Sequence, residues 1–274
     1  MPELAEVRYF SRRWFPGMGR KVKKVHLRPG KRVFRGTRTA DLNRFLTGQS
    51  LQEIRTHGKQ MIFRFGRDHW LGVHLGMTGK LSAEPTGYRP ARHDHLVLDT
   101  AGPVLVFQDP RLFGRIRFAR SPHPPPWWSS LPPDLFSREF SPSRLQRIFQ
   151  QRSRTPLKAL LLMQEFFPGV GNWMADEILW QTRLDPRTRA GSVTGPTIAK
   201  IHAKIRKVSR EALRIIGRNW SDPPRSWLFL HRWSDGGKCP RCRQPLVRRP
   251  VGGRTTCWCP SCQKPDLPRR SCRS

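Results

Sequence analysis

Apolar positions follow two rhythms along the chain, and the first half is dominated by the shorter one. Leu4, Val7, Phe10 and Trp14 recur at helical spacing and are followed by Pro16-Gly17, which predicts one leading helix. Beyond it, short alternating or apolar runs bounded by Gly and Asp predict β-strands at 22–27, 51–65, 70–75, 95–100, 104–108 and 115–119. This pattern is typical of an antiparallel sandwich or barrel.

The second half follows the helical rhythm. Three segments, at 141–150, 156–165 and 172–182, are candidate helices. The clearest helix is predicted at 197–216, where basic residues lie opposite an apolar stripe of Ile198, Ile201, Ile205, Val208, Ala212 and Ile216. Strands followed by helices predict an α+β protein.

Prolines mark the boundary between the two rhythms. They crowd 121–126 and return at Pro132-Pro133, where regular structure cannot continue. The length of 274 residues also favours two domains. We therefore expect an N-terminal β-sandwich domain at 1–120, a proline-rich linker at 121–137, a helical domain at 138–220, and a connecting segment with a cysteine cluster at 221–274.

Charge narrows the class of partner. There are 52 Lys and Arg against 19 Asp and Glu, a formal net charge of +33, so the chain attracts polyanions. The basic residues are spread over the whole chain, which favours a folded protein with a broad basic face over a basic tail. On charge alone, a ribosome-associated protein and a merely well-solvated one remain alternatives.

Two absences bear on location. No run of 18 apolar residues occurs, so we expect no membrane span. The start, Met1-Pro2-Glu3-Leu4, has no apolar signal region. We therefore expect an intracellular, cytoplasmic protein.

Cysteine spacing predicts a metal site. Two Cys-Pro-x-Cys turns, each able to point two sulfurs at one ion, supply the four predicted ligands: Cys239, Cys242, Cys259 and Cys262. Because all four positions are thiolates, the expected ion is one structural Zn²⁺. Cys257 could replace Cys259 by count but lacks the turn, so we interpret Cys257 and Cys272 as free thiols. The stretch between the turns suits a β-hairpin, which would present Arg254.

The N-terminus offers a nucleophile. If Met1 is removed, Pro2 becomes a secondary amine, and α-amines titrate near roughly 7.7–8.0. Such an amine can attack an electrophilic carbon and form an iminium, with the adjacent Glu3 as acid or base. The alternative is structural, since many chains begin Met-Pro and acids are common in a first helical turn.

A glycine-bearing turn, Phe167 to Asn172, precedes one candidate helix. Asn172 is expected to cap that helix, and free N–H groups at a helix start favour phosphate. An ordinary connection between two helices is the alternative.

Six motifs in order resemble the formamidopyrimidine-DNA glycosylase/endonuclease VIII family over essentially the full chain. They are Pro2-Glu3-Leu4-Ala5-Glu6-Val7, His57-Gly58-Lys59, His74-Leu75-Gly76-Met77-Thr78-Gly79, Asp109-Pro110-Arg111-Leu112-Phe113-Gly114, Pro168-Gly169-Val170-Gly171-Asn172, and Gly253-Arg254 with the cysteine pairs. The segments at Glu3 and Met77 are closer to the formamidopyrimidine branch. Departures include Ala5, where the family often has proline, and Arg8, where glutamate is usual.

The resemblance implies a fold and an activity. The fold would be a β-sandwich catalytic domain, a helix–two-turn–helix DNA-binding domain and a zinc finger. The activity would be that of a monomeric, bacterial-type, nucleoid-associated DNA glycosylase and AP lyase acting on damaged double-stranded DNA. It would remove formamidopyrimidines, hydantoins or other oxidised bases, and 8-oxoguanine stays open because the region 217–239, which caps that base in relatives, is short here.

The resemblance also implies residue roles. Pro2 would attack C1′ of the damaged nucleoside, Glu3 would be its acid/base partner, and Lys59 would contact phosphate near the lesion and assist catalysis. The gap left by the flipped nucleotide would be filled by Met77, Arg111 and Phe113, and phosphates would be held by His74, Lys158, Asn172 and Arg254. Two alternatives remain: a non-catalytic lesion- or DNA-binding relative, and a zinc-ribbon RNA-binding protein.

Overall fold

The computed structural model describes residues 1–264, so Cys272 lies outside the described residues. The chain divides into two compact units, the first spanning Met1–Leu131 and the second beginning at Pro132. Within the described residues, no helix has both the length and the apolar character needed to cross a bilayer.

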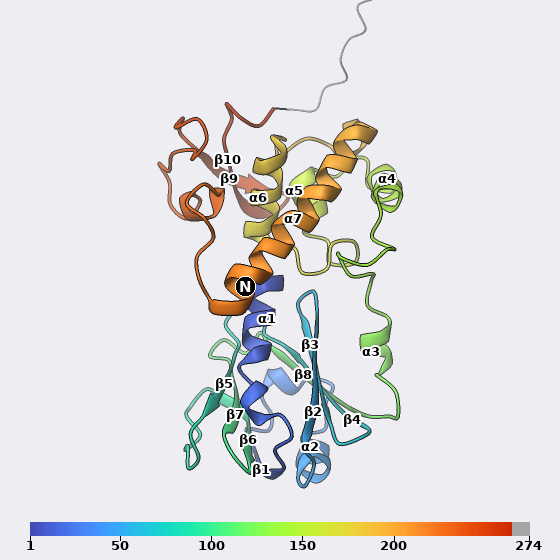
Figure 1. Ribbon diagram of the computed structural model, residues 1–274, viewed down its shortest axis with the longest axis vertical. Helices are drawn as coiled ribbons and strands as arrows, with labels where there is room; N and C mark the ends of the chain where they lie inside the picture. Colours follow the sequence, from blue (N-terminus) through green and yellow to red (C-terminus); the bar gives the residue numbers. More distant parts are fainter. Residues whose placement is uncertain (265–274) are drawn as a thin grey trace, which may run out of the picture. The chain divides into compact units, whose positions relative to one another are not determined.

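The first unit is a β-sandwich with a leading helix. Its helices and strands are α1 (Leu4–Arg12), β1 (Val22–Leu27), α2 (Thr39–Leu46), β2 (Leu51–His57), β3 (Gln60–Phe65), β4 (His69–His74), β5 (Lys80–Glu84), β6 (Asp94–Thr100), β7 (Val104–Gln108), β8 (Arg115–Arg120) and α3 (Pro126–Ser129). The strands form two antiparallel four-stranded sheets, β1-β6-β7-β5 and β2-β3-β4-β8, which Figure 1 shows as two layers. The predicted antiparallel sandwich is confirmed.

Alternation along the strands builds the core of this unit. In β3 and β4, Phe63, Phe65, Leu71 and Val73 point to one face and are buried, while the residues between them point to the other face. Trp14, just after α1, is also fully buried and lies against the Phe63 ring, with 4.6 Å between the ring centroids. The leading helix is thereby held on the core that its apolar stripe predicted.

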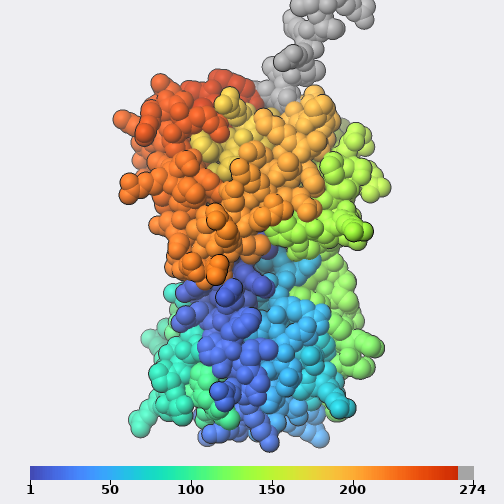
Figure 2. Space-filling view, viewed as in Figure 1, coloured from blue at the N-terminus to red at the C-terminus, as the bar shows by residue number. Residues whose placement is uncertain are grey.

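The second unit is helical and ends in a hairpin. Its elements are α4 (Pro142–Gln151), α5 (Leu157–Leu161), α6 (Asn172–Thr182), α7 (Gly195–Asn219), β9 (Val247–Val251) and β10 (Arg254–Trp258). The predicted apolar stripe of α7 is buried, and the space-filling view shows this helix, in golden orange, on the visible face of the unit (Figure 2). The division of this unit into a helical domain and a zinc finger at residue 220 stays a prediction.

The structure departs from the expected elements in several places. The run 51–65 is two strands, because Gly58 adopts φ +55° and turns the chain. Three short elements, α2, α3 and β5, were not predicted. The helix expected at 156–165 ends at Leu161, since the side chain of Gln164 bonds to backbone groups at Leu162, Gly169 and Val170 and holds a turn there.

The proline-rich segment is partly ordered against the sandwich. Pro126 stands at the first position of α3, where its fixed φ favours a helix start. The next residue, Trp127, covers Gly72 of β4, and the Trp70 indole donates to the carbonyl of Ser121 at 2.9 Å. Residues 121–131 therefore fall within the first compact unit, and the linker bounds 121–137 stay a prediction.

Candidate nucleic-acid interface and metal centre

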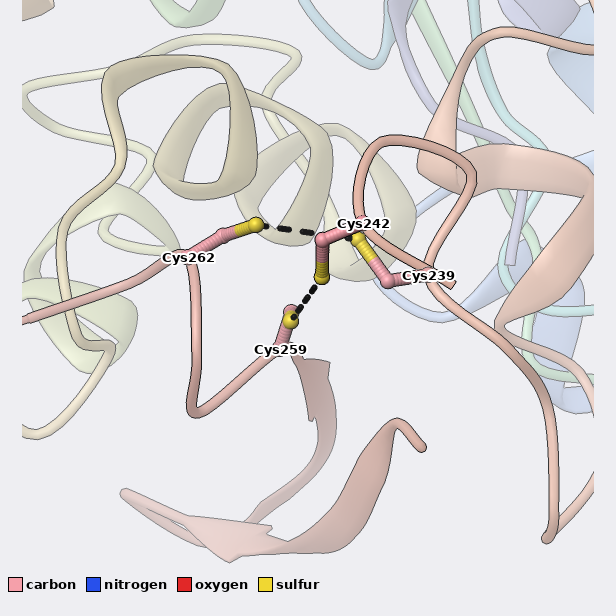
Figure 3. Close-up of side chains that lie close together, drawn as sticks. All are labelled: Cys239, Cys242, Cys259 and Cys262. Carbon is pink, nitrogen blue, oxygen red and sulfur yellow. Dashed lines mark hydrogen bonds between the residues drawn. The ribbon is translucent and has the colours of Figure 1, made fainter. Parts of the chain in front are cut away.

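Four cysteines gather in the second unit (Figure 3). The Sγ atoms of Cys239, Cys242, Cys259 and Cys262 all lie within 4.8 Å of one another. Two of the separations are 3.9 Å, between Cys239 and Cys262, and 3.5 Å, between Cys242 and Cys259. A tetrahedral ion with metal–sulfur bonds of about 2.3 Å needs sulfurs about 3.8 Å apart. The predicted ligand set is therefore positioned to bind one metal ion.

Neighbouring side chains fix this cluster to the helices. The Trp180 indole N–H, near the end of α6, points to Cys239 Sγ at 3.4 Å, and Arg241 stacks over the Trp180 ring at 4.1 Å. Gln263 accepts from the Cys259 N–H at 2.9 Å and donates to the Leu184 carbonyl at 2.8 Å. Such contacts orient ligands before a metal binds.

Cys257 lies apart from the metal ligands. It is buried, and burial raises the pKa of its thiol to about 12. Its backbone N–H donates to the carboxylate of Asp176 at 3.0 Å. Among the described residues, Cys257 is not one of the four cysteines whose sulfurs gather at the predicted metal site.

The hairpin presents Arg254 beside α6. Gly252 and Gly253 have φ of +59° and +76°, as a tight two-residue turn requires, and Arg254 follows, exposed, as the first residue of β10. Asn172 donates through its side chain to the carbonyl of Thr255 at 2.9 Å. The cap of α6 is Gly171, so the expectation that Asn172 caps this helix is wrong: its amide ties the helix start to the hairpin.

A buried ion cluster lies behind these residues. The ammonium of Lys158 pairs with Asp176 and donates to the carbonyl of Asn172 at 2.6 Å, and the side chains of Lys158 and Asp176 are both 0% exposed. Arg232 contacts the same carboxylate through two nitrogens, at 2.6 and 3.1 Å. Lys158 therefore lies in the interior beside the predicted phosphate-binding helix start.

In the first unit, Pro2 and Glu3 directly precede α1. Pro2 is half-buried, and Glu3, only 2% exposed, is the N-cap of the helix. Glu3 and Glu6 form a capping box, in which the Glu6 carboxylate accepts from the Glu3 N–H at 3.1 Å. Local helix chemistry thus fixes the backbone of the predicted acid/base residue.

Lys59 and His74 lie at the same end of the β2-β3-β4-β8 sheet. Lys59 follows Gly58 in the turn between β2 and β3, and Gln60 pairs with His74 across the sheet. Burial, followed by the positive charges of Lys59, Arg35 and Arg117, lowers the pKa of His74 to about 4. The Gly76 N–H donates to His74 Nδ1 at 3.0 Å, so the proton of the neutral ring lies on Nε2, which can donate to an anion.

Two loops carry the predicted wedge residues. Met77 and Phe113 are 44% and 38% exposed, unusual for large apolar side chains, and Arg111 stacks over the Phe113 ring at 4.8 Å. The loops touch through backbone: a Cβ placed on Gly76 would lie 2.4 Å from the carbonyl carbon of Phe113. The structure therefore brings the three predicted wedge residues onto two loops in contact.

Buried Asp109 joins these loops. Its carboxylate accepts from the Thr78 hydroxyl and the Gly114 N–H, both at 2.6 Å, and from the Arg111 N–H at 3.3 Å. No role for Asp109, Asp176 or Arg232 follows from the sequence. Only Asp109 carried a signal, because it opens a quoted motif.

The chain has a β-sandwich unit and a helical unit that ends in a hairpin with four clustered cysteines. Together with the net charge of +33, this fold defines a two-domain protein with a metal site and the charge typical of nucleic-acid-binding proteins. Residues 1–116 match the formamidopyrimidine-DNA glycosylase N-terminal domain, and residues 131–222 match the formamidopyrimidine-DNA glycosylase H2TH domain. The chain belongs to the formamidopyrimidine-DNA glycosylase family.

Individual relatives agree with this assignment. A formamidopyrimidine-DNA glycosylase of Thermus thermophilus is 36% identical over 277 residues, covering 96% of this chain and 98% of that protein. The solved structure of Lactococcus lactis Fpg with DNA containing an oxidized pyrimidine is 28% identical, with a TM-score of 0.85 and coverage of 96% and 100%. The same Fpg with DNA containing an abasic site is 27% identical, with a TM-score of 0.85 and coverage of 96% and 99%.

Proposed function

We propose that this protein is a base-excision-repair DNA glycosylase and AP lyase that removes oxidised bases from double-stranded DNA. The observation that carries the proposal is the start of α1, where Pro2 directly precedes a Glu3 that is buried and held in a capping box. A chain of this family with both groups in place has the nucleophile and the acid/base partner that the chemistry needs.

The proposed reaction begins after removal of Met1. The Pro2 nitrogen attacks C1′ and loses its proton, the bond between C1′ and the base breaks, and the departing base takes a proton. The bond between C1′ and the ring oxygen O4′ then breaks, O4′ takes a proton, and the opened sugar is left as an iminium on Pro2. The resulting iminium acidifies the 2′ hydrogen, so its removal expels the 3′ phosphate by β-elimination, and δ-elimination then expels the 5′ phosphate. Glu3 would move protons at the sugar, and Lys59 would bind phosphate near the lesion.

The DNA contacts are proposed residue by residue. The exposed Met77 and Phe113, with Arg111, would fill the stack after the nucleotide flips out. His74 would donate to a phosphate through Nε2, and Asn172 and Arg254 would hold phosphate at the start of α6 and on the hairpin. Lys158 is buried against Asp176, so we propose that it reaches phosphate only if that ion cluster rearranges.

The metal is proposed to be one structural Zn²⁺. Four thiolates leave no open position on a tetrahedral ion, and such an ion supplies folding energy to its hairpin. The protein would act as a cytoplasmic, nucleoid-associated monomer.

Trapping with borohydride tests the proposal. Untagged protein, with Met1 shown to be absent by mass spectrometry, is incubated with duplexes bearing an abasic site, dihydrothymine, 8-oxoguanine or a hydantoin. The reductant converts the iminium into a permanent crosslink, which we expect at Pro2, and its yield ranks the lesions. Pro2→Gly and Glu3→Gln should suppress base excision while duplex binding survives.

The other outcomes separate the alternatives. Duplex binding without a crosslink on any substrate would indicate a non-catalytic relative. Preference for RNA over lesion-bearing DNA would indicate a zinc-ribbon RNA-binding protein.

A further inference from the structure

The β2-β3-β4-β8 sheet has a cavity on the face turned away from the sandwich core. Its volume is about 210 Å³, below the roughly 300–1,000 Å³ of typical small-molecule pockets, so it suits a small group. Residues that line it include Arg35, Gly72, His74, Arg115, Arg117 and Trp127.

Strand register explains why the cavity lies there. His74 pairs with Arg115, and Gly72 pairs with Arg117, so the two rows stand next to each other on one face. Gly72 has no side chain, and the Trp127 ring occupies the space above it, since a Cβ on Gly72 would lie 2.5 Å from that ring. Trp127 thereby forms one wall, and Arg117 stacks over it at 5.6 Å from the ring centroid.

The cavity concentrates positive charge without a counter-charge. Within residues 1–264, no carboxylate lies in ion-pair distance of Arg35, Arg115 or Arg117. Burial lowers the pKa of Arg35 and of Arg117, and the positive charge of Arg115 lowers both further. Like charges held this close destabilise the fold unless an anion joins them.

Donors in the cavity remain available to such an anion. The Nε of Arg115 is buried and has no hydrogen-bond partner among the described residues. Arg35 uses one terminal nitrogen on the carbonyl of Gly114, at 2.6 Å. His74 adds a neutral Nε2–H donor, because its Nδ1 is occupied by the Gly76 N–H. Planar guanidinium forks beside a neutral donor match the oxygens of a phosphate.

We propose that this cavity is a phosphate-binding site built by Arg35, Arg115 and Arg117 on the outer face of the sheet. The phosphate is expected to come from the backbone of the bound DNA strand, because His74 lies at the same cavity. This choice rests on the proposed function. The second source is a free or terminal phosphate.

Salt dependence of binding tests the site. Binding of a duplex that carries an uncleavable abasic-site analogue is measured over a range of KCl for wild type, Arg117→Gln and Arg35→Gln. Loss of one phosphate contact should lower the slope of log K against log[KCl] by about 0.9 and weaken binding roughly tenfold at fixed salt. The matched control is Arg67→Gln, which removes the same charge from an exposed turn of the same sheet and should leave the slope nearly unchanged.

Replacing backbone phosphates one at a time by neutral methylphosphonates locates the contact. If the bound phosphate belongs to the DNA backbone, one methylphosphonate position should weaken binding by the wild type. The same position should not further weaken binding by Arg117→Gln. If the source is free phosphate, no position stands out, and inorganic phosphate raises the melting temperature of wild type and Arg67→Gln but not of Arg117→Gln. Arg117→Lys, which keeps the charge, should retain part of either effect and so exclude misfolding.

The proposal is overturned if Arg117→Gln and Arg35→Gln match Arg67→Gln in slope, in the phosphonate scan and in the response to inorganic phosphate. These readouts do not depend on catalysis. Absence of a borohydride crosslink in wild type would reject the lyase chemistry and leave the slope comparison intact.

Discussion

Two buried aspartates organise the two units in opposite ways. Asp109, in the first unit, is surrounded by neutral donors: one hydroxyl and two backbone N–H groups. Asp176, in the second, is surrounded by the ammonium of Lys158, the guanidinium of Arg232 and one backbone N–H. Each lies beneath residues predicted to touch DNA, the wedge loops in one case and the start of α6 in the other.

The two arrangements differ in how much stability is lost when the carboxylate is removed. Around Asp109 the partners are neutral, so losing the carboxylate leaves unsatisfied dipoles. Around Asp176 the partners are charged, so losing it leaves two cations in a dry interior, which costs far more. The loops around Asp109 are therefore held by hydrogen-bond geometry, and the start of α6 around Asp176 is held by charge balance.

The largest expected effect comes from the metal, which acts on the second unit alone. Cys242→Ser should lose the ion and unfold the β9–β10 hairpin, since apparent binding energies of structural zinc sites are about 10–16 kcal/mol. Metal stoichiometry and hydrogen exchange of β10 measure this, with β8 as the internal reference. Cys257→Ala is the matched control and should keep the ion; a variant at Cys242 that also keeps it would contradict the assignment.

Removing the carboxylate of Asp176 should lower stability more than removing that of Asp109. Asp176→Ala should lower the free energy of unfolding by about 3–5 kcal/mol, because Lys158 and Arg232 stay buried without a counter-charge. Urea denaturation measures it. Adding Arg232→Met should recover part of the loss, and a double variant no more stable than the single one would show that charge balance is not the cause.

Glu177, next to Asp176 in α6, is a second buried acid with different partners. Its partners are neutral, and burial raises the pKa of Glu177 to about 7. The folded state then holds its proton above the unfolded value near 4.5, so this stability is complete below pH 4.5 and is lost as the pH rises through 7. The loss is on the order of 3 kcal/mol.

The check is the pH profile of unfolding between pH 5 and 8 for the metal-loaded protein. Glu177→Gln should lack the fall seen in wild type. Profiles with the same slope in both proteins would show that Glu177 does not titrate in this range.

The smallest effect on stability is expected at Asp109. Asp109→Asn keeps one acceptor oxygen and should cost about 1–2 kcal/mol, the price of one or two unsatisfied donors. Its stronger signature should be faster hydrogen exchange at Gly114 and Arg111, measured with Thr78→Val as a milder companion. An Asp109→Asn loss equal to that of Asp176→Ala would remove the contrast between the units.

Local chemistry is what the sequence made predictable. The leading helix, most strands and α7 follow from apolar periodicity, and the four ligands follow from two Cys-Pro-x-Cys turns. The wedge loops and the Pro2-Glu3 start were found because they resemble a family. In contrast, α2 and β5 are short and partly exposed, so their patterns carry little periodicity.

Long-range pairing is what the sequence left hidden. Asp176 and Arg232 are 56 residues apart, and neither position shows which buried charge will meet it. Likewise, Gly72 alone does not predict the cavity. The glycine leaves room for the ring of Trp127, which lies in the segment expected to be a linker. Lys158 was predicted from resemblance as a phosphate contact, and only the fold shows that it is buried.

The hairpin turn has a thermodynamic consequence for recognition. Arg254 is preceded by two glycines at positive φ, followed by a residue bonded to α6, and carried by a strand that leads directly to a cysteine ligand. The backbone freedom of this arginine is thus surrendered when the protein folds and the ion binds, before any DNA arrives. The proposed contact of Arg254 with a phosphate should therefore carry a small entropic penalty.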